Sequence, residues 1–162
     1  MKPQAILFCC TGNICRSPTA EAVFAKKVAD AGLSDRIRVD SAGTHGYHVG
    51  EAPDPRSQRA ARARGYDLSA LRARRFESDD FDRFDLVLAM DADNHAFLAR
   101  LCPPSHNHKL KLTMEYARRH AEREVPDPYG GGPDGFDVVL EMLEDAIAGL
   151  LLTLTGGNPI KR

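Results

Sequence analysis

The sequence lacks tryptophan, a long apolar run and a large net charge of either sign. Its 162 residues carry 22 Lys and Arg against 23 Asp and Glu, which leaves a formal net charge of −1. This balance gives no global reason to bind nucleic acid or an anionic membrane, so any anion site has to be built locally. No apolar run approaches membrane-spanning length, and the N-terminal residues do not resemble a signal peptide. We expect a cytoplasmic protein with neither a nucleic-acid nor a membrane partner.

Cysteine is scarce as well, and its distribution is uneven. Cys9, Cys10 and Cys15 lie in one short segment, and Cys102 is far from them. This spacing is unlike the disulfide framework of a small secreted protein. In a reducing compartment, the clustering suggests reactive thiols.

Short apolar stretches alternate with helical periodicity along a chain whose length suits one domain. Patterns typical of buried strands occur at residues 6–9, 36–39, 86–89 and 109–112, and helical patterns at 18–31, 56–64, 91–101 and 136–154. The alternation predicts a single-domain, three-layer α/β fold, with a parallel sheet covered by helices on both faces. We expect the domain to span 1–157, followed by a short tail at 158–162.

The first turn of this fold is the first place to look for a site, because ligands of open parallel sheets bind beyond the carboxyl ends of the strands. After the first strand, Ser17 is suited to cap the following helix and Pro18 to occupy its first position. Gly32 stands where that helix would end. The sequence therefore predicts a strand, a tight turn and a helix in immediate succession.

The turn itself reads Cys-Thr-Gly-Asn-Ile-Cys-Arg-Ser, from Cys10 to Ser17. A cysteine followed six positions later by arginine says little alone, but here the pair brackets a loop with Gly12 and Asn13, which tolerate left-handed backbone. Backbone N–H groups in such a loop, together with the helix dipole, can surround one anion. We expect the phosphate-binding loop to comprise Thr11, Gly12, Asn13, Ile14, Cys15 and Ser17.

Cys10 and Arg16 have distinct chemical roles in this interpretation. The positive field of the loop favours thiolate over thiol at Cys10, which would stand where sulfur can attack phosphorus in line. Arg16 can clamp the phosphate oxygens in a planar, bidentate manner. The alternative is that Cys10 is only a small buried apolar residue at a strand end.

Hydrolysis also needs a proton donor for the leaving group and a base for the attacking water. Asp127 lies between Pro126 and Pro128, in a segment whose composition is typical of a surface loop. By itself this aspartate could simply form a turn. Together with the cysteine loop, it becomes our candidate general acid and base.

These residues resemble a known family. The segment from Cys10 to Glu21 is similar to the N-terminal signature of the low-molecular-weight protein tyrosine phosphatases, and 127–130 resembles their general-acid loop. Residues 39–44 and 88–91 follow the family pattern too, so the resemblance covers nearly the whole chain. It implies a central four-stranded parallel sheet, no metal or other cofactor, and a two-step reaction through a phosphocysteine.

The resemblance also assigns roles to individual residues. It implies that Cys10 is the nucleophile, that Arg16 binds phosphate and that Asp127 is acid and then base. Further residues are assigned to hold the loop (Asn13 and Ser41), to stabilise the thiolate (Ser17) and to line the mouth around a substrate ring (Tyr47 and Tyr129). Phosphotyrosine-containing proteins would be the substrates, and phosphate or other oxyanions the inhibitors.

Cys15 stands where several family members carry a second cysteine that forms a reversible disulfide with the nucleophile. Such a neighbour traps a sulfenic acid before it is oxidised irreversibly. Cys9 departs from the family pattern, and strand alternation should point it away from the site and into the core. Two more departures are Ala70, where some relatives have histidine, and Gly130 after Tyr129, where many have a second tyrosine.

Related activities on the same fold remain as alternatives. Arsenate reductases need two further cysteines, whereas only Cys102 lies downstream here. Protein-arginine phosphatases tend to have threonine at the position of Ile14, whose apolar side chain instead favours an aromatic ring. These differences favour phosphotyrosine.

Two features suggest binding rather than catalysis. The segment from Arg56 to Arg75 contains seven arginines and one acidic residue, and it could form an RNA-binding face. The preferred interpretation is a solvated helix surface, which could also steer acidic phosphopeptides. His106 and His108 could be proposed as a metal pair, but without further ligands a surface loop is preferred.

Overall fold

A four-stranded, all-parallel sheet forms the centre of the computed structural model, which describes residues 1–132 and 134–156. Its strands lie in the order β2-β1-β3-β4. They comprise β1 (Gln4–Cys10), β2 (Ile37–Gly43), β3 (Leu86–Ala89) and β4 (Leu110–Leu112). The predicted α/β fold with a four-stranded parallel sheet is confirmed. The expected boundary at 157 and the tail at 158–162 lie outside the described residues.

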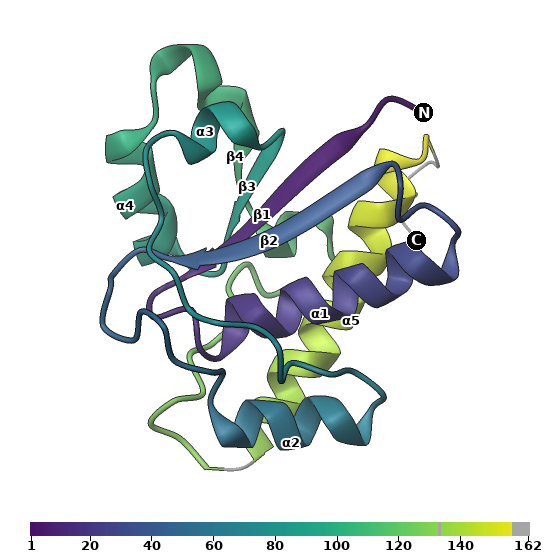
Figure 1. The fold of residues 1–162 in the computed structure, drawn as a ribbon, viewed down its shortest axis with the longest axis vertical. Helices are drawn as coiled ribbons and strands as arrows, with labels where there is room; N and C mark the ends of the chain where they lie inside the picture. Colours follow the sequence, from purple (N-terminus) through teal and green to yellow (C-terminus); the bar gives the residue numbers. More distant parts are fainter. Residues whose placement is uncertain (133, 157–162) are drawn as a thin grey trace.

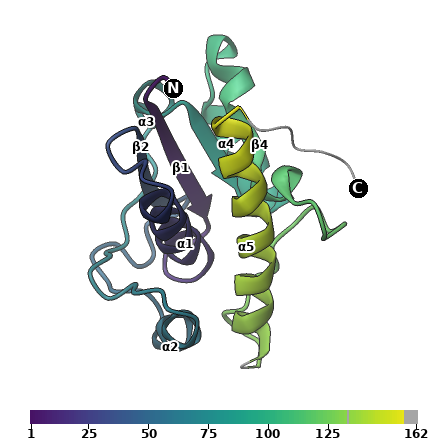
Figure 2. The same ribbon diagram turned by 90° about the vertical axis from the view of Figure 1, so that its right-hand side faces the viewer.

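Helices cover both faces of the sheet (Figure 1). On one face lie α1 (Arg16–Asp30), α2 (Pro55–Ala63) and α5 (Asp134–Leu154), and on the other lie α3 (Asp80–Arg83) and α4 (Ala92–Leu101). Figure 2 shows the long helix α5 beside α1, which is seen end-on. Two 3₁₀ helices, η1 (Pro104–Lys109) and η2 (Thr113–Tyr116), flank β4.

Alternation along β1 divides the core into two parts, one on each face. Phe8 and Cys10 pack with side chains of α1 and α5, whereas Leu7 and Cys9 pack with those of α3 and α4. Phe8 meets Phe24 of α1 edge-on, with ring centroids 5.8 Å apart. Cys9 is fully buried in the second part, as the alternation predicted.

The start of α1 differs from the sequence prediction. The helix begins at Arg16, and Cys15 occupies the N-cap without a side-chain hydrogen bond, so the prediction that Ser17 caps the helix and Pro18 takes its first position is wrong. The reason is that the hydroxyl and amide of Ser17 are turned toward the sulfur of Cys10. The end is as predicted, since Gly32 adopts a left-handed conformation with φ of 73°.

β2 is longer than predicted and reaches the site. Its polar continuation, Asp40 to Gly43, pairs with Leu7 to Cys10 of β1. A strand ending at 39 was expected because Asp40 and Ser41 interrupt the apolar pattern. The extension places Ser41 beneath the loop that follows β1.

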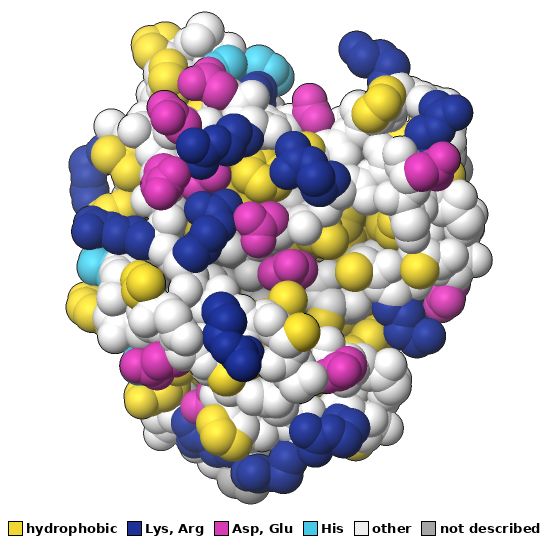
Figure 3. Space-filling view, viewed as in Figure 1, with side chains coloured by type: hydrophobic (Ala, Val, Ile, Leu, Met, Phe, Trp, Pro, Cys, Tyr) yellow, Lys and Arg dark blue, Asp and Glu magenta, His cyan; other side chains and the backbone are white. Residues whose placement is uncertain are grey.

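The surface carries both charges and offers no membrane span. Acidic and basic side chains intermingle on the face drawn in Figure 3, in keeping with the balanced composition. Within residues 1–132 and 134–156, no helix is both long and apolar enough to cross a membrane.

Candidate active site

The loop between β1 and α1 forms the floor of a cavity at the carboxyl end of the sheet. The cavity has a volume of about 230 Å³. Its lining comes from this loop, from the segment after β2 and from the segment before α5: Cys10, Thr11, Gly12, Ile14, Cys15, Arg16, Tyr47, His48, Asp127 and Tyr129. The structure thus brings the predicted nucleophile, phosphate clamp and acid into one cavity.

Cys10 ends β1 with its side chain at the base of this cavity. The residue is 2% exposed, and its sulfur lies 3.0 Å from the Ser17 hydroxyl oxygen. The Ser17 amide donates to the same sulfur at 3.4 Å. Because α1 begins at Arg16, its first amides and its dipole point at Cys10, which favours a negative sulfur.

Arg16 is buried beside Cys10 and is held by groups from two other segments. Its Nη1 donates to Asp91 Oδ2 at 2.7 Å and to the carbonyl oxygen of Val125 at 2.9 Å. Burial works against its charge, but the neighbouring Cys10 and the carboxylates of Asp91 and Asp127 outweigh burial and raise the pKa of the guanidinium. A fixed positive charge therefore stands next to the sulfur.

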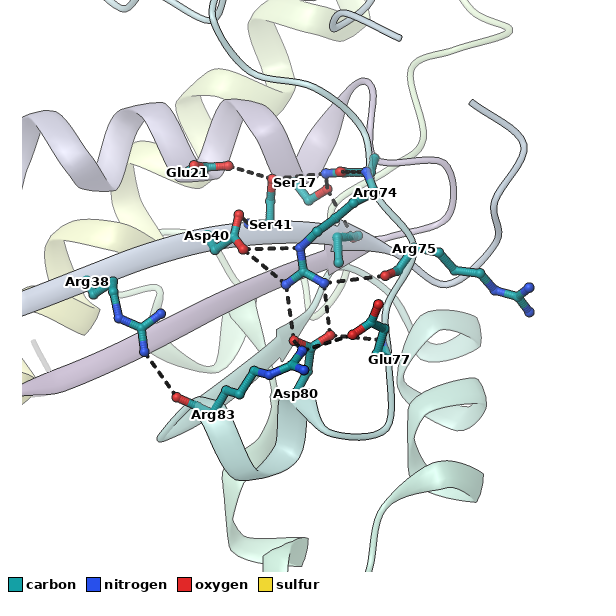
Figure 4. Close-up of polar contacts among 12 residues, drawn as sticks. Ser17, Glu21, Arg38, Asp40, Ser41, Arg74, Arg75, Glu77, Asp80 and Arg83 are labelled. Carbon is teal, nitrogen blue, oxygen red and sulfur yellow. Dashed lines mark hydrogen bonds and ion pairs between the residues drawn. The ribbon is translucent and has the colours of Figure 1, made fainter. Parts of the chain in front are cut away.

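Asn13 fixes the shape of the loop. It has a φ of 59°, the left-handed backbone that the sequence suggested for this turn. Its side-chain nitrogen donates to Ser17 Oγ at 2.8 Å and to Ser41 Oγ at 3.0 Å. Its side-chain oxygen accepts from the backbone N–H of Arg74 at 2.9 Å. Figure 4 shows three of its partners, Ser17, Ser41 and Arg74, close to one another.

Asp127 reaches the cavity from the segment before α5. Its Oδ2 lies 3.8 Å from Nη2 of Arg16, and its side chain is 55% exposed. Val125, two residues earlier, anchors the segment through a backbone hydrogen bond to Met90, which directly follows β3. The carboxyl is therefore held over the cavity while it remains in contact with solvent.

Two tyrosines form the rim. Tyr47 is 69% exposed and stacks on His45, whereas Tyr129 is 50% exposed and lies under the guanidinium of Arg56. Arg56 is in turn held by Asp54, which caps α2. Both rings are thus supported from behind and present their free faces at the mouth.

Several residues at the site were not singled out from the sequence. Asp91, in the segment 88–91 that carried part of the resemblance, orients Arg16 and caps α4. Asn94 donates to the Thr11 hydroxyl at 3.1 Å. His48 lines the cavity against Gly12, and its Nδ1 lies 3.0 Å from a carboxylate oxygen of Glu51. No sequence signal marked His48, since a lone histidine in a loop has no informative spacing.

Cys15 is the second cysteine in the cavity lining. Burial raises the pKa of its thiol to about 12, although a hydrogen bond to Ser57 acts in the opposite direction. All four cysteines are free thiols in this structure. Cys15 is therefore a protonated, weakly reactive neighbour of Cys10 at neutral pH.

The histidine pair lies away from the cavity, and of the arginine-rich segment Arg56 reaches its rim through Tyr129. His106 contacts Asp82 on the α3 side, and the described part of the chain contains no group of three or more potential metal ligands. In the arginine-rich segment, Arg64 pairs with Glu144 and Arg74 pairs with Asp80. These two positive charges are committed to acidic partners within the fold.

Comparison with known proteins assigns the chain to a family. Residues 5–158 match the family described as low molecular weight phosphotyrosine protein phosphatase. A low molecular weight protein-tyrosine-phosphatase of Streptomyces coelicolor is 48% identical over 149 residues, which cover 90% of each chain. The human low molecular weight phosphotyrosine protein phosphatase is 39% identical over 139 residues, covering 85% of this chain and 87% of the human one.

Solved structures agree with the sequence comparison. A protein tyrosine phosphatase from Entamoeba histolytica, crystallised with Hepes in its active site, superposes with a TM-score of 0.92 at 40% identity and covers 94% of this chain and 97% of its own. A Bacillus subtilis structure superposes with a TM-score of 0.90 at 33% identity, covering 96% of this chain and 97% of its own. The chain therefore belongs to the low molecular weight protein tyrosine phosphatase family.

Proposed function

We propose that this protein hydrolyses phosphotyrosine in proteins through a phosphocysteine on Cys10. The observation that carries the proposal is the convergence of Cys10, Arg16 and Asp127 on one cavity at the carboxyl end of the sheet. Each supplies one requirement of phosphoryl transfer: a nucleophile, a charge clamp and a proton donor.

In the first step, the sulfur of Cys10 attacks phosphorus while Arg16 and the loop amides bind the equatorial oxygens. The S–P bond forms as the bond between phosphorus and the tyrosyl oxygen breaks. Asp127, in its protonated form, gives its proton to the departing oxygen, so that a phenol rather than a phenolate leaves. The hydroxyl of Ser17, 3.0 Å from the sulfur, stabilises the thiolate before attack.

In the second step, Asp127 acts as a base. The carboxylate left by the first step takes a proton from water, and the water oxygen attacks phosphorus as the S–P bond breaks. Inorganic phosphate leaves, and the thiolate of Cys10 is restored with the electron pair of the broken bond. The partial exposure of Asp127 suits this alternation, because water has to reach the same carboxyl that faced the leaving group.

The rim supports an aryl phosphate as the substrate. Tyr47 and Tyr129 offer ring faces to a substrate ring, and Ile14 adds an apolar wall inside the cavity. An arginine side chain would find no carboxylate there except the proposed acid, Asp127. We further propose that phosphate and other oxyanions inhibit by occupying the loop, and that the protein works in the reducing cytoplasm, where Cys10 stays reduced.

Leaving-group dependence tests the role of Asp127. Asp127→Ala should slow the turnover of phenyl phosphate about a hundredfold or more, but that of a nitrophenyl phosphate far less, because a good leaving group needs little protonation. Asp79→Ala is the matched control, since Asp79 is an exposed carboxylate on the α3 side. An equal loss for both substrates would refute the acid role, and turnover by Cys10→Ser would refute the nucleophile.

A further inference from the structure

A chain of hydrogen bonds leads from Cys10 away from the cavity to a carboxyl on α1; Figure 4 labels its members Ser17, Ser41 and Glu21. Ser17 Oγ contacts the Cys10 sulfur at 3.0 Å and accepts from Asn13 at 2.8 Å. Asn13 also donates to Ser41 Oγ at 3.0 Å, and Ser41 Oγ donates to Glu21 Oε1 at 2.6 Å. We name this the rear relay: Cys10, Ser17, Asn13, Ser41 and Glu21.

The direction of each hydrogen bond in the rear relay is fixed by Asn13. Its oxygen accepts from the backbone N–H of Arg74, so its nitrogen has to be the donor to both serines. Each serine hydroxyl then has one proton left to give. That of Ser41 goes to Glu21, and that of Ser17 goes to Cys10, with the Ala42 carbonyl oxygen a more distant alternative at 3.5 Å. Glu21 is the acceptor that ends the relay.

Glu21 is also placed so that its charge state matters. It follows Ser17 by four positions and so lies on the same face of α1. Burial raises the pKa of its carboxyl to about 7, opposed by the hydrogen bond from Ser41. Of the charged groups around it, Asp40 of β2 raises this pKa further and Arg74 lowers it.

Within residues 1–132 and 134–156, no basic side chain forms an ion pair with Glu21. Arg74, the cation that acts on it, is held by Asp40 through Nε at 3.1 Å and by the fully buried Asp80 through Nη1 at 3.0 Å. Figure 4 shows the Arg74 guanidinium between these two carboxylates, with Glu21 on the far side of Ser41. A carboxylate at Glu21 therefore adds a negative charge behind the loop without a direct ion pair.

We infer that Glu21 is a positioning residue for Cys10, and that its negative charge, once the carboxyl is ionised, opposes the negative charge of the thiolate and of the bound phosphate. The inference rests on the proposed function. As an acceptor, Glu21 binds the hydroxyl proton of Ser41, which leaves the oxygen of Ser41 free to accept from the Asn13 amide. The Asn13 amide then donates to both Ser41 and Ser17, and Ser17 donates its own proton to the sulfur of Cys10. As a charge, it weakens the site once it ionises, because like charges repel across a poorly screened interior.

Two variants separate the acceptor from the charge. Glu21→Gln keeps a carbonyl acceptor for Ser41 and stays neutral at every pH, whereas Glu21→Leu removes both. Glu144→Gln is the matched control, because Glu144 also accepts a hydroxyl hydrogen bond, from Tyr66 at 2.6 Å, but lies on α5 away from the cavity. The measurement is kcat/KM for a phosphotyrosyl peptide from pH 5.5 to 8.5, with melting temperatures to confirm folding.

We expect the ratio of kcat/KM for Glu21→Gln to that of the unaltered protein to rise from about one at pH 5.5 to about five at pH 8.5. Glu21→Leu should be about tenfold slower than Glu21→Gln at all pH values, since the Ser41 hydroxyl loses its partner. A ratio that does not change with pH would overturn the charge role. Equal rates for Glu21→Leu and Glu21→Gln would overturn the acceptor role.

A second readout does not depend on phosphatase activity. Iodoacetamide reacts with the thiolate of Cys10, so the alkylation rate reports how much thiolate is present. At pH values below the plateau of this rate, the alkylation rate of Glu21→Gln divided by that of the unaltered protein should also rise with pH. If the proposed function were wrong, Cys10→Ser would keep turnover while this pH dependence persisted. If only the inference about Glu21 were wrong, Cys10→Ser would be inactive and the alkylation ratio would stay flat.

Discussion

If Cys10 is oxidised to a sulfenic acid, the burial of Cys15 makes the closure of a Cys10–Cys15 disulfide slow and pH-dependent. With a pKa raised to about 12, Cys15 is a thiolate in only about one molecule in ten thousand at pH 8. An ordinary thiol with a pKa of about 8.5 is about one-quarter ionised at that pH. The thiolate population of Cys15 is thus about two-thousandfold smaller.

The greater nucleophilicity of a thiolate with a high pKa offsets part of the effect of this smaller thiolate population on the rate. A thiolate of higher pKa attacks faster, with a Brønsted coefficient of about 0.4–0.5, so a difference of about 3.5 in pKa returns roughly fortyfold. We therefore expect closure of the Cys10–Cys15 disulfide to be about sixtyfold slower at pH 8 than for an unperturbed thiol in the same place. Its rate should rise about tenfold per pH unit between pH 7 and 9.

The assay is a short peroxide pulse followed by quenching with an alkylating agent at successive times, and mass mapping of the cysteines. Ser57→Ala should slow closure further, because the hydrogen bond from Ser57 lowers the pKa of Cys15. Cys102→Ser should change nothing, since Cys102 lies on the α4 side of the sheet. A closure rate independent of pH, or a disulfide that excludes Cys15, would refute this reasoning.

Three further substitutions test the packing and electrostatics of the fold. Burial raises the pKa of Glu21 to about 7, so the folded state loses stability as the pH rises from about 4.5 to 7. Glu21→Gln should therefore raise the free energy of unfolding, measured by urea denaturation, by about 3 kcal/mol at pH 8 but not at pH 4. Gly149→Ala should destabilise the protein by about 3 kcal/mol in the same assay, because a methyl group there overlaps the backbone carbonyl of Tyr116. Gly43→Ala places its methyl carbon 2.8 Å from the Thr11 carbonyl oxygen, and should lower kcat/KM about tenfold by displacing the phosphate loop. No stabilisation by Glu21→Gln at pH 8, an unchanged stability for Gly149→Ala, or an unchanged kcat/KM for Gly43→Ala would contradict the corresponding prediction.

The strands and long helices could be predicted from the sequence because their apolar periodicity reflects burial. β3 has the predicted bounds, and α5 carries the apolar stripe that signalled it. The short helices could not be predicted in this way. α3 has only four residues. Two of them are buried: Asp80 binds Arg74, and Phe81 packs in the core.

The part of the candidate site whose residues are close together in the chain could be predicted from the sequence. Cys10 and Arg16 share one loop, so their proximity follows from the turn itself. The meeting of Asp127 with Arg16 depends on tertiary packing over more than a hundred positions, and only the family resemblance anticipated it. Glu21 was not given a role from the sequence because its partner, Ser41, lies beyond residue 39, where the predicted strand ended.

The most direct test of the central claim is to find the phosphoryl group on the enzyme during turnover. The Asp127→Ala variant should accumulate the intermediate, because water is no longer activated. It would be mixed with a nitrophenyl phosphate, whose leaving group needs little protonation, so that Cys10 is still phosphorylated; the reaction would then be quenched rapidly and mapped by mass spectrometry. The account predicts one phosphoryl group, on Cys10. Phosphorylation of a different residue, or none while a Cys10→Ser variant still releases phosphate, would contradict it.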